Sequence, residues 1–496
     1  MHSRMIVEAS AGTGKTYNIV GLFIRLLIQK RLNVNEILVV TFTRMATREL
    51  KERLLSRLKK SLKVSIQDDY KGSDPFLRDL VQFCDQYADS HKLLEEAIRN
   101  FDEAQVHTIH GFCQKVLMEE ALVSGMPFEF DVSQTDDLLR ESVQDFWRSF
   151  IDQFSETEEG RYFISQIMEF GTTPDELLET LKPLFSKPYA DPEPSNIEID
   201  VISELKAIIE KRNEISALWR EDRDTILEEL VRSDISGMGK KTVEKNGDKF
   251  DRFIEDQKYT LVPPDNFEKF TSSYLNKDEH LKKDGRIKPS HPLFDQCEEY
   301  SLLVSRITDI KTSFLLHAFQ KIRELRMQKS RKSVQLTYDD LLTFLDQALR
   351  KPETGKQLAE TLRKKYPVAL VDEFQDTDPI QYRIFDKIYN REECKSSVFM
   401  MIGDPKQAIY GFRGADVYTY LRARDSVEAE NSFTLSKNFR SSDGLISGIN
   451  TLFTSSASPF IEENISFSEA QKGEQPDEKR LNYLHDTKAP LQINYR

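Results

Sequence analysis

Two carboxylates stand side by side where an apolar run ends in the last third of the chain. Asp372 and Glu373 directly follow the apolar run Val368 to Val371. Such a run predicts a buried parallel strand, and open α/β sheets place their functional groups at the carboxyl ends of strands. There Asp372 can hold Mg²⁺, often through water. Glu373 can orient and deprotonate a water molecule that attacks a phosphate.

A glycine-rich segment near the N-terminus supplies the partner for these acids. The segment consists of Ala9, Ser10, Ala11, Gly12, Thr13, Gly14, Lys15 and Thr16. It lies between a short apolar run, Met5 to Val7, and a segment with apolar residues at helical spacing. That context predicts a phosphate-binding loop, in which backbone N–H groups and the helix N-terminus attract phosphate. Lys15 is expected to reach the β- and γ-phosphates, and Thr16 to ligate Mg²⁺.

Each motif has a plain structural alternative. The first segment could be a glycine-rich turn with an incidental lysine, and the acids could cap a following helix. The glycine segment departs from the usual pattern only in carrying Ala9 as its first residue, while both glycines beside Lys15 are kept. Together the two motifs favour a nucleotide site over both alternatives.

A third polar segment, Gly403 to Asp416, follows the apolar run Val398 to Ile402. Gln407 within it is neutral and bidentate, which suits the sensing of a γ-phosphate. Three further side chains could form a platform for the bases of single-stranded nucleic acid: Tyr410, Phe412 and Arg413. Aromatic residues alone would more often indicate core packing, but the neighbouring motifs favour stacking on bases.

An arginine follows a strand-like segment further along the chain. It is Arg440, within the stretch Leu435 to Ser442. Planar guanidinium donors suit the charge that develops on a γ-phosphate during transfer. Arg440 is therefore a second candidate sensor of the nucleotide.

The arrangement of strands and helices predicts how these motifs meet. Residues 1–125 and 336–434 alternate strands with helices, which indicates an α/β domain with a parallel sheet. Residues 126–335 read as charged helices with few strand signals. Because the phosphate loop and the acidic strand must share one nucleotide, the helical block is expected to be a large insertion into one domain. The polar stretch from Gly237 to Ser290 is predicted to be irregular.

Length, charge and cysteines limit the possible classes of protein. A chain of 496 residues should contain two to four domains, and its net charge of −13 argues weakly against a surface made for nucleic acid. A local basic stretch, Arg306 to Lys332, could contact DNA, but a solvated helix face explains it at least as well. The four cysteines are scattered, which predicts no disulfide framework or zinc site and fits the cytoplasm: Cys84, Cys113, Cys297 and Cys394. No membrane span or signal peptide is predicted.

The motifs in their order resemble a known family. GTGKT, TFTRMATREL, TIHGF, DEFQDT, GDPKQAIYGFRGAD and NFRSS are similar to motifs of the UvrD/Rep/RecB branch of superfamily 1 DNA helicases. Within that branch, DEFQDTDPIQYRIF, HTIHGFCQKVL and IGDPKQAIY look most like RecB-type subunits of exodeoxyribonuclease V. AddA-type subunits are the nearest alternative. The resemblance runs from about Met5 past Phe453.

The resemblance implies a RecA-like motor domain and a role for each matching residue. ATP and Mg²⁺ would be served by Lys15, Thr16, Asp372, Glu373, Gln407 and Arg440, with Phe439 stacked on adenine. Single-stranded DNA would be held by Phe42, Thr43, Thr108, His110, Tyr410, Phe412 and Arg413. His110 could equally be a structural histidine. The helical insertion would be an accessory domain on duplex DNA, and other subunits would complete a helicase–nuclease that moves 3′→5′ in double-strand-break processing and recombinational repair.

Two departures from the family pattern shape the expectations. The family's glutamine-bearing segment ahead of the phosphate loop has no counterpart here, and the chain reaches Arg496 without the later motifs or a nuclease. We therefore expect an N-terminal fragment in which residues 435–496 begin a second RecA-like domain, and we expect little turnover from it alone. The alternatives are a stand-alone nucleotide-dependent DNA-binding module and a small-molecule kinase. The aromatic and arginine segment and the large insertion argue against the kinase.

Overall fold

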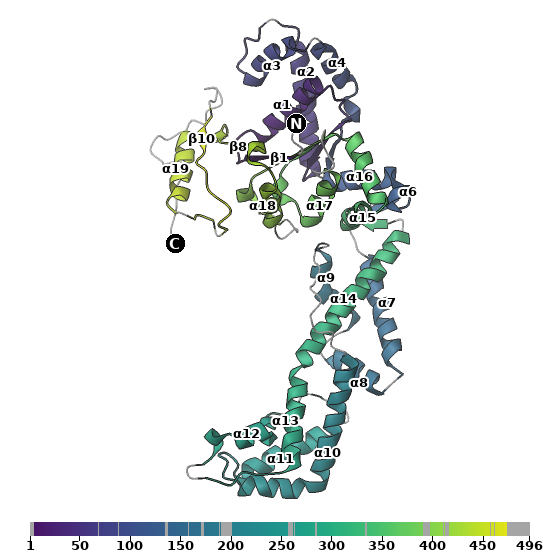
Figure 1. The fold of residues 1–496 in the computed structure, drawn as a ribbon, viewed down its shortest axis with the longest axis vertical. Helices are drawn as coiled ribbons and strands as arrows, with labels where there is room; N and C mark the ends of the chain where they lie inside the picture. Colours follow the sequence, from purple (N-terminus) through teal and green to yellow (C-terminus); the bar gives the residue numbers. More distant parts are fainter. Residues whose placement is uncertain are drawn as a thin grey trace. The chain divides into compact units, whose positions relative to one another are not determined.

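The chain forms two compact units, which are described one at a time (Figure 1). The computed structural model describes residues 4–473 except 68, 88, 134–136, 157, 170–172, 188, 190–200, 256–260, 262, 283–284, 333–334, 390–396, 410, 412–415, 457 and 461. The first unit comprises Met1–Gln134, Ser186–Tyr189 and Ser333–Arg496. The second comprises Thr135–Phe185 and Ala190–Lys332.

A six-stranded parallel sheet forms the centre of the first unit. Its strands, in spatial order, are β3 (Val106–Thr108), β2 (Ile37–Thr41), β6 (Val368–Val371), β7 (Val398–Gly403), β1 (Arg4–Ala9) and β8 (Ser432–Leu435). Every neighbouring pair runs parallel. The predicted α/β fold with a parallel sheet is confirmed. Since β7 lies between β1 and β6, the segments that follow these three strands emerge together at one edge of the sheet.

Helices pack against both faces of this sheet because its strands are apolar on both sides. Ile37 and Val39 of β2 point into one buried cluster, and Leu38 and Val40 point into the other. This alternation is the two-residue period of a strand, and burial on both faces explains the continuous apolar runs. The first cluster contains residues of α1 (Lys15–Gln29), α2 (Arg44–Val64), α3 (Pro75–Asp85) and α4 (Ser90–Arg99). The second contains residues of α5 (Ile109–Glu119), α15 (Tyr338–Arg350), α16 (Thr354–Lys365), α17 (Pro379–Ile388) and α18 (Val417–Asp425).

Shorter elements complete the first unit. Two small parallel sheets pair β4 (Asp131–Ser133) with β5 (Gln335–Thr337) and β9 (Lys437–Asn438) with β10 (Gln471–Lys472). The remaining helices are α6 (Ala121–Ser124) and α19 (Asp443–Thr454), with 3₁₀ turns η1 (Phe101–Glu103), η4 (Phe374–Asp376), η5 (Pro405–Gln407) and η7 (Ala429–Asn431). Of these, η4 and η5 directly follow the two central strands that carry the polar motifs.

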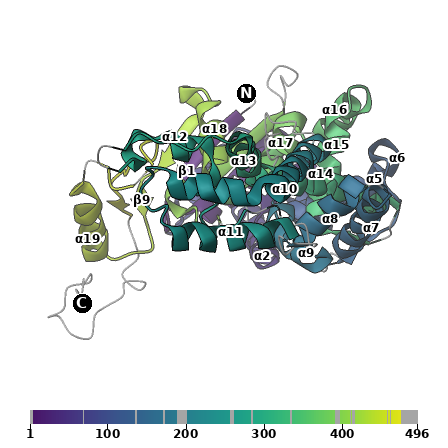
Figure 2. The same cartoon turned by 90° about the horizontal axis from the view of Figure 1, so that it is seen from below.

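The second unit is helical around its own aromatic core. Its helices are α7 (Asp137–Phe154), α8 (Glu158–Glu169), α9 (Pro174–Phe185), α10 (Val201–Arg232), α11 (Lys240–Glu255), α12 (Ser272–Asn276), α13 (Pro292–Ser305) and α14 (Ile307–Lys332), with η2 (Phe267–Phe270) and η3 (Asp278–His280). Figure 2 shows α10 and α11 side by side. In the core, the Phe250 ring lies 4.3 Å from that of Trp219 and 5.5 Å from that of Phe267, centre to centre.

The prediction of irregular structure from Gly237 to Ser290 was wrong for α11. That helix is rich in lysine, yet Val243, Phe250 and Ile254 fall on one face and are buried. The apolar spacing of a helix therefore outweighed the polar composition. The rest of the stretch holds only the short helices η2, α12 and η3 among its described residues.

The structure also bears on the expectations for the basic stretch, the cysteines and a membrane span. Lys329, in the basic stretch that forms α14, pairs with Asp145 at 2.6 Å and Glu141 at 3.3 Å, so part of this charge is satisfied within the unit. Three cysteines are free and buried, and Cys394 lies outside the described residues: Cys84, Cys113 and Cys297. Within the described ranges, no helix combines the length and apolar character that a membrane span needs.

Candidate nucleotide-binding site

The predicted phosphate loop, Ala9 to Thr16, joins β1 to α1. Gly12 and Gly14 have φ angles of 82° and 87°, a left-handed conformation that other residues adopt only at a cost. Thr13 folds the loop on itself, because its backbone N–H and its hydroxyl both donate to the Ser10 carbonyl, at 3.2 and 2.7 Å. Ala9 is the last residue of β1 and is fully buried beside Leu435, so a methyl group fits where the usual pattern has glycine.

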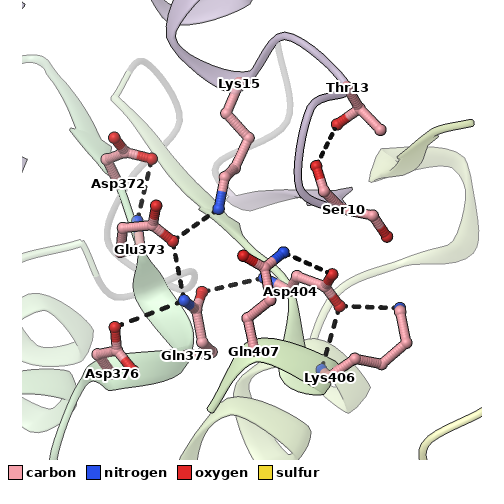
Figure 3. A network of polar contacts seen from close by, with 10 residues as sticks. All are labelled: Ser10, Thr13, Lys15, Asp372, Glu373, Gln375, Asp376, Asp404, Lys406 and Gln407. Carbon is pink, nitrogen blue, oxygen red and sulfur yellow. Dashed lines mark hydrogen bonds and ion pairs between the residues drawn. The ribbon is translucent and has the colours of Figure 1, made fainter. Parts of the chain in front are cut away.

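The lysine of this loop meets the second carboxylate of the acidic strand. Lys15 Nζ lies 2.6 Å from Glu373 Oε2 (Figure 3). The lysine side chain is 12% exposed and that of Glu373 is 37% exposed, so the pair lies at the border of the solvent. Glu373 itself has a φ of 52°, which is rare for a residue with a side chain. The fold therefore brings Lys15 and Glu373 together although they are 358 residues apart.

Asp372 and Thr16 line one cavity of about 560 Å³ at this edge of the sheet. Burial raises the pKa of Asp372 to about 6, and the negative charge of Glu373 acts in the same direction. A hydroxyl and a carboxylate are hard oxygen donors of the kind that Mg²⁺ prefers, and this ion keeps several water and phosphate ligands. The donor set fits Mg²⁺ bound together with a nucleotide. Across the described residues, no group of three or more His, Cys, Asp or Glu side chains forms a metal cage.

The loop after β7 adds a second polar group. Asp404 is buried, and its carboxylate accepts hydrogen bonds from Gln407 Nε2 at 2.8 Å and from the Lys406 backbone N–H at 3.1 Å. Lys406 Nζ lies 2.8 Å from Asp404 Oδ1 and also contacts Glu8 of β1. Burial opposes ionisation of Asp404, but the Lys406 ammonium and the hydrogen bonds from Lys406 and Gln407 together outweigh it, so the pKa of Asp404 lies below its usual range. The amide of Gln407 is thus held in place and lines the same cavity.

The segment that carries Phe439 and Arg440 lies against the phosphate loop. The Phe439 N–H donates to the Gly12 carbonyl at 2.8 Å, and Asn438 Nδ2 donates to the Ala11 carbonyl at 3.0 Å. A Cβ on Gly12 would lie 2.8 Å from Cβ of Arg440, closer than carbon atoms can approach. The Phe439 side chain remains 46% exposed beside the loop.

The predicted DNA-contacting residues divide into three groups. Phe42 and Thr43 line the same cavity as Asp372 and Glu373. Thr108 and His110 do not line it: the Thr108 hydroxyl caps α5 by accepting from Gly111 N–H at 3.1 Å, and burial lowers the pKa of His110. Its ring packs edge-on against that of Tyr338, 5.4 Å away. The remaining three lie outside the described residues: Tyr410, Phe412 and Arg413.

Four residues of the site had no role in the sequence interpretation. They are Glu8, Gln375, Lys406 and Asn438, which connect the motifs to one another. Three of them lie inside quoted motifs, so a polar residue beside a strand end was the available signal. Glu8 carried no such signal, because its role depends on its register opposite Gly403.

Comparison with known proteins defines the class to which this fold and site belong. The UvrD/REP helicase N-terminal domain matches residues 1–428. The chain therefore belongs to the UvrD/REP helicase family.

Curated relatives carry the name RecBCD enzyme subunit RecB. The protein from Escherichia coli K12 is 34% identical over 488 residues, which cover 94% of this chain and 39% of that protein. The protein from Haemophilus influenzae is 35% identical over 510 residues, covering 93% and 41% respectively. The protein from Chlamydia trachomatis is 28% identical over 488 residues, covering 92% and 43%. The chain thus spans about two fifths of the length of these relatives.

Proposed function

We propose that this chain binds ATP with Mg²⁺ and single-stranded DNA as the motor region of a RecB-type helicase–nuclease that processes double-strand breaks. The observation that carries the proposal is the meeting of Lys15 and Glu373 at 2.6 Å, at the carboxyl edge of the parallel sheet. A phosphate-binding lysine beside a partly exposed carboxylate places a charge for the γ-phosphate next to a group that can accept a proton from the attacking water.

The residues have distinct tasks in this proposal. The phosphates of ATP attract Lys15 away from Glu373, which leaves the carboxylate ready to accept a proton from the attacking water. Mg²⁺, held by Thr16 and Asp372, would neutralise charge on the β- and γ-phosphates. Gln407 and Arg440 sense the γ-phosphate from two other segments. The phosphate loop itself, from Ala9 to Thr16, supplies backbone N–H groups.

Coupling to DNA is assigned to the same unit. Phe42 and Thr43 share a cavity with the ATP-site residues, so a strand bound there would lie next to the groups that hydrolyse ATP. The further DNA contacts proposed are Thr108, His110, Tyr410, Phe412 and Arg413, with Phe439 on adenine. The domains proposed are a motor domain (1–125 and 336–434), an accessory domain for duplex DNA (126–335) and the start of a second RecA-like domain (435–496). Partner subunits and a cytoplasmic location complete the proposal.

A titration of the chain with Mg·ATP and single-stranded DNA tests this function. We expect Lys15→Ala to lower ATP affinity at least about tenfold, because charge-assisted phosphate contacts are lost. Lys30→Ala is the matched control, since Lys30 is exposed at the other end of the same helix. Equal ATP affinity in both variants would remove the assignment. Binding of both ligands with little hydrolysis is the result expected of this chain by itself, because a motor of this family hydrolyses ATP between two RecA-like domains.

A further inference from the structure

Gln375 is a buried amide that joins the two polar motifs. Its side chain lies in η4 and is 2% exposed. Its Nε2 donates to Glu373 Oε2 at 2.8 Å, and its Oε1 accepts from the Asp404 backbone N–H at 3.0 Å (Figure 3). The partners fix the orientation of the amide, because a carboxylate needs a donor and an N–H needs an acceptor. Nε2 also makes a longer contact, at 3.5 Å, with Asp376 Oδ2. Gln375 therefore links Glu373 to the backbone of Asp404 through one amide.

The end of β7 is shaped around this amide. A Cβ built on Gly403 would lie 2.5 Å from Gln375 Oε1, a distance that real Cβ atoms do not show. Any other residue at position 403 would push the amide away from Asp404 N–H. The glycine is thus required by close approach of a side chain, and its φ is not in the left-handed region.

Hydrogen bonds through Gln375, here called the Gln375 bridge, connect the Glu373 carboxylate to Gln407, the predicted γ-phosphate sensor. Gln375 joins Glu373 to Asp404, and the Asp404 carboxylate holds the Gln407 amide. At Glu373, both Lys15 and Gln375 contact Oε2. Within the described part of the chain, Oε1 of Glu373 accepts no hydrogen bond, so it is the oxygen that can accept a proton from water. When phosphate draws Lys15 away, Gln375 still holds Oε2.

We infer that Gln375 is a positioning residue that orients Glu373 as the general base and ties it to the loop carrying Gln407. The inference rests on the proposed ATPase function and names a residue to which that function gave no role. Misplacement of a catalytic group by about 1 Å can cost about 100-fold in rate without loss of substrate binding. Loss of the bridge should therefore lower kcat and leave KM for ATP nearly unchanged.

Two substitutions break the bridge differently. Gln375→Glu keeps an acceptor for the Asp404 N–H but sets a second carboxylate against Glu373. Gln375→Ala removes the contacts with Glu373 and Asp404, and the longer one with Asp376 as well. Gln105→Glu is the matched control. Gln105 is also buried and accepts from Lys115 Nζ at 2.7 Å, but it lies just before β3, at the amino-terminal ends of the strands and so away from the site. We expect kcat to fall about 100-fold in both Gln375 variants, KM to stay within about threefold, and the control to match the wild type.

Gly403→Ala perturbs the same contact from the other side. Its new methyl group must displace the Gln375 amide, so it should reproduce the loss of kcat. In the double variant Gln375→Ala with Gly403→Ala, the methyl group no longer meets the amide, and only its 3.1 Å approaches to the backbone nitrogens of positions 374 and 375 remain. The second substitution should therefore add much less than Gly403→Ala costs by itself. Such non-additivity is the mark of one shared contact. Two independent effects that multiply would overturn the inference.

A binding measurement distinguishes failure of the positioning role of Gln375 from failure of the proposed ATPase function. The affinity for Mg·ADP with aluminium fluoride, which mimics the transferring phosphoryl group and its water, is measured beside that for Mg·ADP alone. The Gln375 variants should lose about tenfold or more of the preference for the mimic and keep their affinity for ADP. Unchanged kcat and preference, or equal losses for mimic and ADP, would overturn the positioning role. Absence of any nucleotide binding by the wild type would refute the proposed function, and the inference with it.

Discussion

Replacing Asp372 with asparagine should stabilise the nucleotide-free protein at neutral pH and weaken its binding of Mg·ATP. Burial raises the pKa of this carboxyl from 3.8 to about 6. The folded state therefore binds the proton more tightly than the unfolded state. The associated stability is fully present below pH 3.8 and is lost as the pH rises through about 6. At neutral pH the ionised carboxylate is a cost to the fold that a neutral amide avoids.

The size of the effect follows from this difference in pKa. A difference of about two units corresponds to about 3 kcal/mol at pH 7.5, and the same linkage leaves about 1 kcal/mol at pH 4.5. These are upper limits, since the side chain of Asp372 keeps some contact with solvent and its Oδ1 accepts from the Glu373 N–H at 3.0 Å. We expect Asp372→Asn to raise the free energy of unfolding by about 1–3 kcal/mol at pH 7.5, with most of the gain gone at pH 4.5.

Urea unfolding of the wild type and of Asp372→Asn at pH 7.5 and pH 4.5 measures this difference in the free energy of unfolding. Asp102→Asn is the control, because it removes an exposed carboxylate of the same unit and should change stability by less than about 0.5 kcal/mol. Isothermal calorimetry on the same samples should show weaker Mg·ATP binding for Asp372→Asn only. A destabilised variant at pH 7.5, or a gain that is equal at both pH values, would refute the reasoning.

Three further predictions address other parts of the molecule. Phe439→Ala should lower affinity for ATP by about 1 kcal/mol and leave that for inorganic triphosphate unchanged, since only a base can stack there; equal losses for both ligands would exclude stacking. Phe412→Ala should weaken single-stranded DNA binding by about 1–3 kcal/mol in a fluorescence anisotropy titration, whereas unchanged affinity would favour core packing. Phe250→Ala should destabilise the second unit by about 3–5 kcal/mol without changing ATP affinity, as measured by urea unfolding and calorimetry, and any loss of ATP binding would contradict this.

The sheet could be predicted from the sequence because its strands are buried on both faces. Val368–Val371 is a continuous apolar run, and it forms a strand with the predicted bounds. Helix α11 could not be predicted from composition, since its lysines hide an apolar face. Periodicity within the element carried the information that the average polarity lacked.

The position of a site residue could be predicted where a short motif in the sequence already places that residue beside a strand end. Lys15 and Glu373 each stand in such a motif, and their meeting followed from the need for one nucleotide. Gln375 was not predictable as a bridge, because its second partner is a backbone N–H on another strand. The space for its amide depends on Gly403, whose missing side chain carries no obvious signal in sequence. Contacts of this kind are set by the register of strands, which a single sequence does not state.

The most direct test of the account is the affinity of Glu373→Gln for Mg·ATP, measured by calorimetry beside the wild type. In the structure, Lys15 pairs with Glu373. If Lys15 binds the phosphates of ATP as proposed, this carboxylate competes with them for the lysine. Removing the charge of this partly exposed carboxylate should free the lysine. We expect Glu373→Gln to bind Mg·ATP about two- to fivefold more tightly than the wild type. Markedly weaker binding by Glu373→Gln would show that the carboxylate does not compete with the nucleotide, and would contradict the site built around Lys15 and Glu373.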